Sequence, residues 1–268
     1  MGGSQKSEDL ILVEKRDKGI AYVTINRPKS LNSLTKAMLN DLAKAFKFLN
    51  GDADVKVIIF TGVGRAFCSG VDLTDAQSVF KGDVENMDTD PVYQMEHCKK
   101  PIIGAINGYA VTAGFELALA CDILIASTDA KFIDTHCKFG IFPSWGLSQK
   151  LPRLIGVNCA REVSLTAMPL DAQLAEKWGL VSRVVPPMEL LKTAHSIAES
   201  IARNHEDLVL RYKAVINDGI RLPFGEAIKL EKERAFKYYK EMPPEMFTQM
   251  QKFISGQSSK KTTPSSKL

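Results

Sequence analysis

The sequence predicts an α/β fold with a parallel sheet, followed by a helical C-terminal region. Up to about Pro186, short apolar strand patterns alternate with helical patterns, which is typical of βα units around a parallel sheet. The segment Val55–Phe60 is a continuous apolar run of the kind that is buried on both faces of a sheet. From Asn158 onward the periodicity is almost wholly helical, so we expect the rest of the chain to add helices.

The elements of the first half follow from turn residues and periodicity. Leu10–Glu14 and Ile20–Ile25 flank the turn residues Asp17-Lys18-Gly19, which predicts a β-hairpin. Apolar residues at helical spacing predict a helix over Thr35–Leu49. The elements expected after Val55–Phe60 are a helical crossover, a strand at Ile102–Ile106, a helix that begins near Gly114 and a strand at Ile123–Ala126.

The C-terminal region is expected to hold the helices Leu190–Arg203, Leu208–Asp218 and Phe224–Glu241. These helices are too amphipathic to stand alone, so we expect them to pack on the core or on a neighbouring subunit. We therefore divide the chain into an α/β core at 1–186, a helical region at 187–255 and a disordered tail at 256–268, which is rich in Ser, Lys and Thr.

Composition excludes several classes of function. The 268 residues are 45% hydrophobic and 25% charged with a net charge of +4, so a soluble globular protein is expected and a nucleic-acid-binding protein is not. The five cysteines are widely spaced without a CxxC pair, which argues against a zinc site and favours reduced thiols in an intracellular compartment. The apolar run Pro101–Ala126 is too interrupted to span a membrane, and we expect no secretory signal.

The last three residues, Ser266-Lys267-Leu268, form a tripeptide that the peroxisomal import receptor reads. A disordered tail would leave this tripeptide accessible. The sequence therefore predicts a peroxisomal protein that binds this receptor.

Glu116 is the strongest candidate for a catalytic group. It is the one charged residue between Pro101 and Cys121. Burying a carboxylate among apolar neighbours costs several kcal/mol unless it is paired or protonated. Its position after a small-residue turn and within an expected helix indicates a general acid or base beside free backbone amides.

Three segments carry further motifs. They are the glycine-rich segment 62–73 (Gly-Val-Gly-Arg-Ala-Phe-Cys-Ser-Gly-Val-Asp-Leu), the segment 107–116 that ends in Glu116, and the segment 140–147 (Gly-Ile-Phe-Pro-Ser-Trp-Gly-Leu). Each segment alone is also compatible with a tight turn between a strand and a helix. Together, in this order and spacing, they resemble the crotonase superfamily of enoyl-CoA hydratases and isomerases, from about Leu10 to Phe253.

This resemblance implies a crotonase-like spiral of ββα units that assembles into homotrimers or homohexamers. It also implies an acyl-CoA substrate whose thioester oxygen is bound by the backbone N–H groups of Val71 and Ala113. Neither a metal nor a separate cofactor is implied, because CoA enters as part of the substrate. The acyl-CoA-binding residues that the resemblance implies are Lys29, Ser69, Gly70, Val71, Asp72, Leu73, Ala113 and Phe115.

Two of these residues also have simpler interpretations. Lys29 would lie near the CoA phosphates, but most lysines before a turn are merely solvated. Phe115, like Phe142 and Trp145, would line the acyl channel, although aromatic residues at such positions more often belong to the core.

His136 marks a departure from the family pattern. Hydratases of this family use two glutamates to hold and split water; Glu116 matches the first, and His136 stands where the second should be. Imidazole can also transfer protons near neutral pH. Alternatively, His136 is a structural residue bonded to Asp134 or Thr135. Asp72, Asp122 and Asp134 are weaker catalytic candidates, and Asp122 is expected to cap the turn before Ile123–Ala126.

The leading hypothesis is a peroxisomal enoyl-CoA hydratase of fatty-acid β-oxidation that adds water to trans-2-enoyl-CoA thioesters, with Glu116 and His136 as catalytic residues. A Δ3,Δ2-enoyl-CoA isomerase is the closest alternative, because moving a double bond needs a single base and Glu116 would suffice. Thioester hydrolysis on the same scaffold and non-catalytic acyl-CoA binding remain further alternatives.

Overall fold

The computed structural model describes residues 9–81 and 86–254. The predicted tail at 256–268, with its Ser266-Lys267-Leu268 tripeptide, lies outside the described residues. The chain divides into two compact units, and the boundary in the sequence falls between Leu210 and Arg211.

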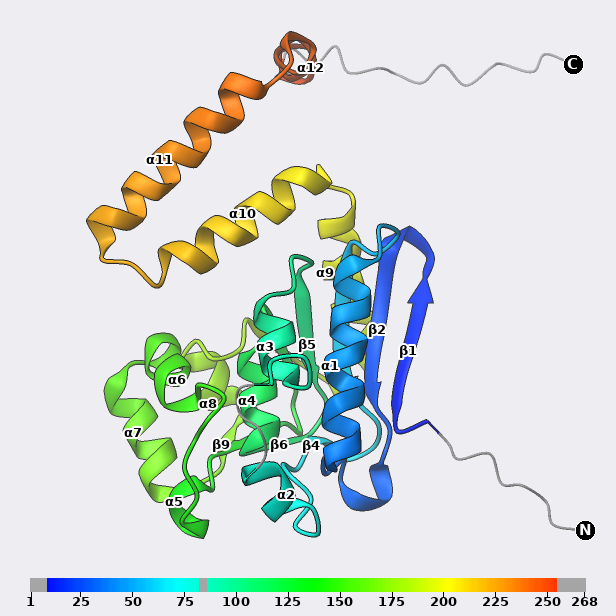
Figure 1. Ribbon diagram of the computed structural model, residues 1–268, viewed down its shortest axis with the longest axis vertical. Helices are drawn as coiled ribbons and strands as arrows, with labels where there is room; N and C mark the ends of the chain where they lie inside the picture. Colours follow the sequence, from blue (N-terminus) through cyan, green and yellow to red (C-terminus); the bar gives the residue numbers. More distant parts are fainter. Residues whose placement is uncertain (1–8, 82–85, 255–268) are drawn as a thin grey trace, which may run out of the picture. The chain divides into compact units, whose positions relative to one another are not determined.

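The first unit is built on two β-sheets (Figure 1). The larger sheet has the strand order β1-β2-β3-β5-β7-β10, and the smaller sheet has the order β4-β6-β8-β9. All neighbours are parallel except β1 with β2 and β8 with β9. The strands are β1 (Ile11–Arg16), β2 (Ile20–Ile25), β3 (Val57–Gly62), β4 (Ala66–Cys68), β5 (Ile102–Ile106), β6 (Tyr109–Val111), β7 (Ile123–Ser127), β8 (Lys131–Ile133), β9 (Leu170–Asp171) and β10 (Arg183–Val185).

Successive strand pairs enter the two sheets in the same way. β3, β5 and β7 lie side by side in the larger sheet, and the strands that follow them, β4, β6 and β8, lie side by side in the smaller one. Helices follow each pair, so the chain winds as a spiral of ββα turns, which is the architecture that the family resemblance implies. The predicted hairpin is also confirmed: β1 and β2 are antiparallel and joined by a short 3-10 turn at Asp17–Gly19.

The helices of the first unit pack around these sheets, and α9 lies on the larger one. They are α1 (Lys36–Gly51), α2 (Ala76–Phe80), α3 (Pro91–Glu96), α4 (Ala113–Leu119), α5 (His136–Phe139), α6 (Leu147–Ile155), α7 (Val157–Thr166), α8 (Ala172–Lys177) and α9 (Leu190–Ala202). The helix α10 (Glu206–Gly219) spans the boundary between the two units.

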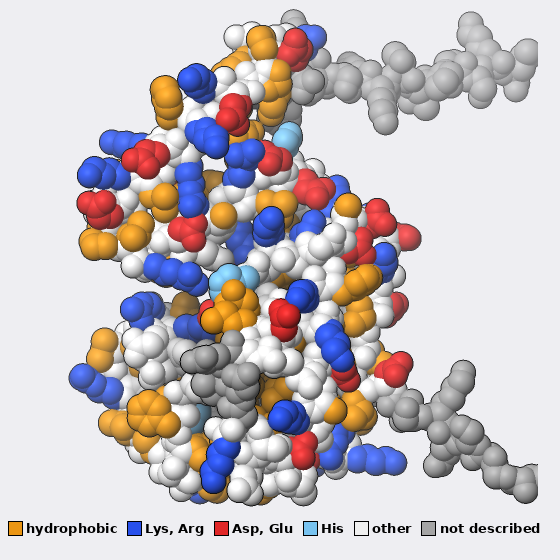
Figure 2. Space-filling view, viewed as in Figure 1, with side chains coloured by type: hydrophobic (Ala, Val, Ile, Leu, Met, Phe, Trp, Pro, Cys, Tyr) orange, Lys and Arg blue, Asp and Glu red, His pale blue; other side chains and the backbone are white. Residues whose placement is uncertain are grey.

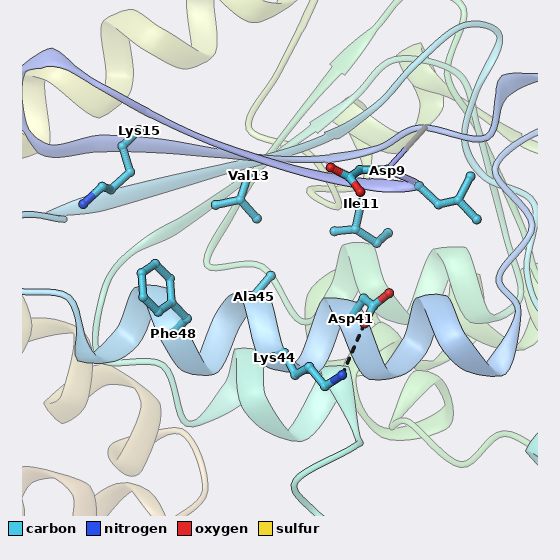
Figure 3. A pocket seen from close by; sticks show the side chains of 9 residues that line it. Asp9, Ile11, Val13, Lys15, Asp41, Lys44, Ala45 and Phe48 are labelled. Atoms are coloured by element: carbon cyan, nitrogen blue, oxygen red, sulfur yellow. Dashed lines mark hydrogen bonds and ion pairs between the residues drawn. The ribbon is translucent and has the colours of Figure 1, made fainter. Parts of the chain in front are cut away.

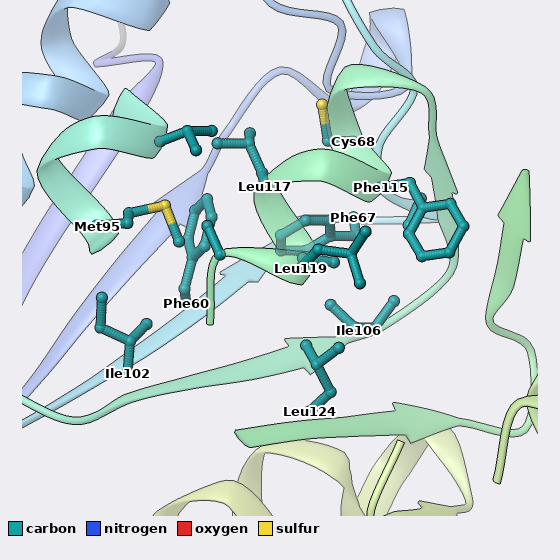
Figure 4. Packing of buried hydrophobic residues seen from close by; sticks show 14 of the residues in the cluster. Phe60, Phe67, Cys68, Met95, Ile102, Ile106, Phe115, Leu117, Leu119 and Leu124 are labelled. Atoms are coloured by element: carbon teal, nitrogen blue, oxygen red, sulfur yellow. The ribbon is translucent and has the colours of Figure 1, made fainter. Parts of the chain in front are cut away.

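The residues of β3 from Val57 to Phe60 are all apolar because both faces of the larger sheet are covered. Ile58 and Phe60 belong to the main core. Figure 4 shows Phe60 in this core with Phe67 and Phe115. On the opposite face, Val57 and its neighbours pack against Leu190, Ala194 and Ala198 of α9. The first helix of the region 187–255, α9, therefore packs on the core.

The expectation of an almost wholly helical chain after Asn158 is wrong at two places. The strands β9 and β10 interrupt the helices there. Both are only two or three residues long, too short to produce a recognisable period of two. For the same reason the sequence does not predict β4, β6 and β8. Strand β3 also begins two residues later than the predicted Val55.

The second unit consists of the rest of α10 with α11 (Phe224–Glu241) and α12 (Pro244–Ile254). Arg234 forms an ion pair with Asp218, and the guanidinium of Arg211 lies 5.6 Å from the centre of the Tyr238 ring. Several large apolar side chains of this unit are exposed (Figure 2), among them Ile216, Ile220, Phe224, Phe236 and Tyr239. Within residues 9–81 and 86–254, every helix is too short or too polar to traverse a bilayer.

Candidate active site

Glu116 lies in the first turn of α4, where every residue from Ala113 to Leu119 is buried. Its side chain is almost inaccessible, and its Oε1 accepts hydrogen bonds from the backbone N–H of Trp145 at 2.9 Å and of Leu147 at 3.5 Å. Burial raises the pKa of Glu116 because it penalises the charged form, and these hydrogen bonds offset only part of the shift. A carboxylate with a raised pKa is suited to accept and return a proton near neutral pH.

The raised pKa of Glu116 makes protein stability depend on pH. Below the ordinary pKa of 4.5 both the folded and unfolded chains hold this proton, and as the pH rises above it only the folded chain keeps it. The wild type should therefore lose stability relative to Glu116→Gln as the pH rises from about 4.5 towards the raised pKa. Urea unfolding of both proteins at about pH 5 and about pH 7.5 measures this difference.

The control for this comparison is Glu176→Gln, because Glu176 is an exposed glutamate that also accepts a backbone N–H, that of Val184. A stability difference between wild type and Glu116→Gln that is the same at both pH values would contradict the raised pKa.

The turn before α4 sets the direction of the Ala113 amide. Thr112 has φ 51° and ψ −106°, a conformation that a β-branched residue rarely adopts. Its backbone N–H donates to Ile133 O at 2.9 Å, and its hydroxyl is hydrogen-bonded to that of Thr135. These contacts hold the strained turn in place, so the first amide of α4 is fixed before any ligand arrives.

The loop that contains Val71 lies against this turn. A Cβ added to Gly70 would be 3.1 Å from Val111 O and 3.9 Å from Ala113 N, which places the two backbones side by side. Within the described residues, the N–H groups of Val71 and Ala113 have no acceptor. The two predicted amides are therefore close together and unpaired, as donors for a ligand oxygen must be.

The same loop is anchored on the segment that precedes α1. Leu34 N donates to Gly70 O, and Asp72 N donates to Leu34 O, both at 2.8 Å. The Asp72 carboxylate pairs with Arg27 at 2.5 Å and accepts hydrogen bonds from Ser33 and Thr74. Hydrogen bonds from Thr74 and Arg27 hold the pKa of Asp72 well below its usual range. The Asp72 side chain thus fixes the loop, and its predicted contact with acyl-CoA stays a prediction.

Asn32 is a fully buried residue of this scaffold whose role the sequence does not predict. Its Nδ2 donates to the carbonyl oxygens of Val63, Ala66 and Phe67, and its Oδ1 accepts from Arg27 N. One side chain therefore satisfies carbonyl groups of the turn before β4 and of β4 itself, immediately before the Val71 loop.

Replacing Asn32 with Asp would put a second carboxylate oxygen in place of Nδ2, so the three carbonyl oxygens would lose their hydrogen-bond donor and face an oxygen instead. The free energy of unfolding should therefore fall by about 2–3 kcal/mol. The control is Asn50→Asp, since Asn50 uses its Oδ1 to accept from Lys99 N and an aspartate can do the same. Urea unfolding measures both, and equal stability of the two variants would contradict this role for Asn32.

His136 lies beside Glu116 and also makes the contact expected of a structural residue. Its Nδ1 is 2.6 Å from Asp134 Oδ1, and its Nε2 is 3.9 Å from Glu116 Oε2. All three side chains are buried. Burial raises the pKa of Asp134, but hydrogen bonds from His136 and Ser164 outweigh that effect and leave the pKa below its ordinary value.

The remaining predicted site residues lie near these groups or beneath them. Lys29 is exposed on the 3-10 turn Pro28–Ser30, close to Leu31, whose carbonyl accepts from Ser69 N at 3.1 Å. Leu73 is 90% exposed at the end of the loop. Phe115 is fully buried with its ring 5.2 Å from that of Phe132, so its side chain packs in the core. Substrate contacts of these residues stay predictions.

The sequence does not predict that the segment with Trp145 and Leu147 hydrogen-bonds to Glu116. The amides of Trp145 and Leu147 point at Glu116 because Gly146 between them has φ 93°, a left-handed conformation that favours glycine. Lys150 closes this turn by donating to Trp145 O at 3.1 Å and pairing with Glu96 at 2.5 Å. Asp122 lies between α4 and β7, and its carboxylate accepts from Ile102 N at the start of the neighbouring strand β5.

Outside this site, the described residues contain a surface groove and several metal-binding residue types, and neither supports a second candidate site. A shallow groove of about 620 Å³ lies between β1 and α1, lined by residues such as Ile11, Val13 and Phe48, and it contains no predicted site residue (Figure 3). In the described part of the chain, no three His, Cys, Asp or Glu side chains are grouped so that they could hold a metal ion.

Comparison with known proteins finds one matching family and several similar proteins whose names agree with that family. A family model described as enoyl-CoA hydratase/isomerase matches residues 15–254. The sequence is 66% identical over 262 residues to a protein of Arabidopsis thaliana named probable enoyl-CoA hydratase 1, peroxisomal, and the alignment covers 98% of each chain. It is 41% identical over 214 residues to a probable mitochondrial enoyl-CoA hydratase of Dictyostelium discoideum, covering 80% of this chain and 77% of that protein. The crystal structure of an enoyl-CoA hydratase from Bacillus anthracis matches with a TM-score of 0.82 at 33% identity, covering 92% of this chain and 97% of that one.

Proposed function

This chain belongs to the enoyl-CoA hydratase/isomerase family, and we propose that it hydrates trans-2-enoyl-CoA thioesters in peroxisomal fatty-acid β-oxidation. The observation that carries this proposal is a buried carboxylate near two unpaired backbone amides. Glu116 and the amide of Ala113 lie in the first turn of α4, and the amide of Val71 lies on the adjoining loop.

In the proposed reaction the two amides bind the thioester oxygen. When the oxygen of water attacks C3, the electron pair of the C2–C3 double bond moves towards the thioester and leaves an enolate oxygen. Fixed donors aimed at that oxygen stabilise it without reorganisation, typically by about 3–4 kcal/mol for one donor. The position of Ala113 at the first turn of α4 adds the positive end of the helix dipole.

Glu116 accepts the proton that the attacking water loses. Its Oε1 is held by the amides of Trp145 and Leu147, so Oε2 is the oxygen left to face the reacting groups. Because burial raises its pKa, the carboxylate is a stronger base than an exposed glutamate.

The partners follow from the same proposal. CoA enters as part of the substrate, and no separate cofactor is required. The CoA moiety would be bound by the loop from Ser69 to Leu73 and by Lys29 on the turn before α1. Phe115 would support the acyl channel from the core. The exposed apolar residues of the second unit would lie in the interfaces of a homotrimer or homohexamer. Ser266-Lys267-Leu268 would bind the peroxisomal import receptor, in keeping with the peroxisomal name of the Arabidopsis relative.

The test is the steady-state turnover of a trans-2-enoyl-CoA and a 3-enoyl-CoA by the purified full-length protein. The proposal predicts fast loss of the conjugated enoyl absorbance from the first substrate. Conversion of the second substrate to the conjugated thioester without hydration would make the protein an isomerase. Release of free CoA would indicate thioester hydrolysis, and binding without turnover would indicate a carrier.

A further inference from the structure

We propose that Asp134 and His136 together replace the second carboxylate of the site, with Nε2 of His136 as the proton donor to C2 and Asp134 as the residue that positions the ring. This inference rests on the proposed hydratase function and names a second acid–base group for it. The inference is carried by three buried side chains that lie next to one another, with His136 between Asp134 and Glu116.

The orientation of the His136 ring is fixed from one side. Asp134 Oδ1 accepts from the backbone N–H of His136 at 3.1 Å and is 2.6 Å from Nδ1. An ionised carboxylate can only accept hydrogen bonds, so Nδ1 carries a hydrogen and donates a hydrogen bond to Asp134. The other ring nitrogen, Nε2, is thereby turned towards Glu116.

The distance between Nε2 and Glu116 Oε2, 3.9 Å, is too long for a direct hydrogen bond. A water oxygen at about 2.8 Å from each atom would hydrogen-bond to both of them. The gap therefore fits a reacting water that is held by both groups, although one of them is an imidazole instead of a glutamate.

Carboxylates face the His136 ring from both sides. Asp134 Oδ1 lies 2.6 Å from Nδ1, and Glu116 Oε2 lies 3.9 Å from Nε2. Lys150 acts electrostatically on Glu116 and is itself paired with Glu96. Ser164 supports Asp134 from α7.

The resulting reaction balances. The oxygen of water forms a bond to C3 while one of its O–H bonds breaks and gives its proton to Glu116 Oε2. The enolate oxygen is held by the amides of Val71 and Ala113, and the C2 carbanion then takes the proton of His136 Nε2. Transfer of the proton from Glu116 back to Nε2 restores the starting state, and the product has gained one molecule of water.

The test is a double-mutant cycle on hydration of trans-2-enoyl-CoA. His136→Gln should lower kcat by about 100-fold or more with little change in KM, and His136→Glu should retain much more of the activity because a carboxylic acid can also donate to C2. Asp134→Asn should lower kcat by about tenfold or more in the wild type. In the His136→Glu background, however, Asp134→Asn should have no further effect, because no imidazole is left to orient.

A merely structural role predicts a different pattern. The backbone N–H of residue 136 donates a hydrogen bond to Asp134 Oδ1, and weakening this bond by removing the negative charge would reduce activity equally in both backgrounds. That result would overturn the inference, as would a kcat of His136→Gln within twofold of wild type. The matched control is His195→Gln, because His195 is hydrogen-bonded to Tyr22 on the other face of the larger sheet. If the wild type hydrates no enoyl-CoA, the proposed function itself fails and this inference fails with it.

Discussion

Replacing Glu116 with Gln is expected to lower kcat for hydration by roughly 100- to 10,000-fold while KM changes little. Glutamine has the same shape, and its amide oxygen can still accept the hydrogen bonds from the amides of Trp145 and Leu147. It cannot accept a proton from water. The loss should therefore appear in the chemical step, measured as the initial rate of enoyl-CoA consumption over a range of substrate concentrations.

Glu176→Gln again serves as the control and should keep the kcat of the wild type, because Glu176 lies on α8 and bonds to Val184 N at the start of β10. If Glu116→Gln retained wild-type kcat, Glu116 could not be the base, and its burial would have to be explained by packing alone.

Replacing Gly114 with Ala is expected to lower kcat by about 100- to 1,000-fold, which is the effect of losing one donor of an oxyanion hole. A Cβ at this position would lie 2.1 Å from Cys68 O, so the start of α4 must move away from the loop that leads to Val71. This movement separates the amides of Val71 and Ala113. We also expect the free energy of unfolding to fall by about 1–3 kcal/mol, because the methyl group overpacks the core.

The control for this prediction is Gly51→Ala at the end of α1, where an added Cβ meets nothing within 4 Å. It should leave both kcat and stability nearly unchanged. A Gly114→Ala protein that folds and turns over like the wild type would show that the approach of α4 to Cys68 does not set the oxyanion hole.

The sequence was most informative where a single element has a strong pattern of its own. The long apolar run of β3 and the helix α11 could be predicted because burial on two faces and helical spacing are each visible in one segment. Strands such as β9 are too short for any period to emerge, and only their pairing with a distant strand makes them strands.

The candidate site shows the same division. Glu116 could be found because a lone carboxylate in an apolar segment is unusual, and the contact of His136 with Asp134 was one of the expected possibilities. The amides of Trp145 and Leu147 could not be found, because their direction depends on the backbone conformation at Gly146 and carries no side-chain signal. Likewise, the sequence leaves open whether His136 transfers protons or is a structural residue bonded to Asp134 or Thr135, whereas the structure places its ring between Asp134 and Glu116.

The most direct test of the central claim, that this site adds water to an enoyl thioester through Glu116, is mass spectrometry of the product formed from trans-2-enoyl-CoA in ¹⁸O-labelled water. The account predicts a hydroxyacyl-CoA that carries the label on C3 with the wild type, and almost none with Glu116→Gln in the same time. Unlabelled 3-enoyl-CoA as the wild-type product, or equal labelling with the variant, would contradict it.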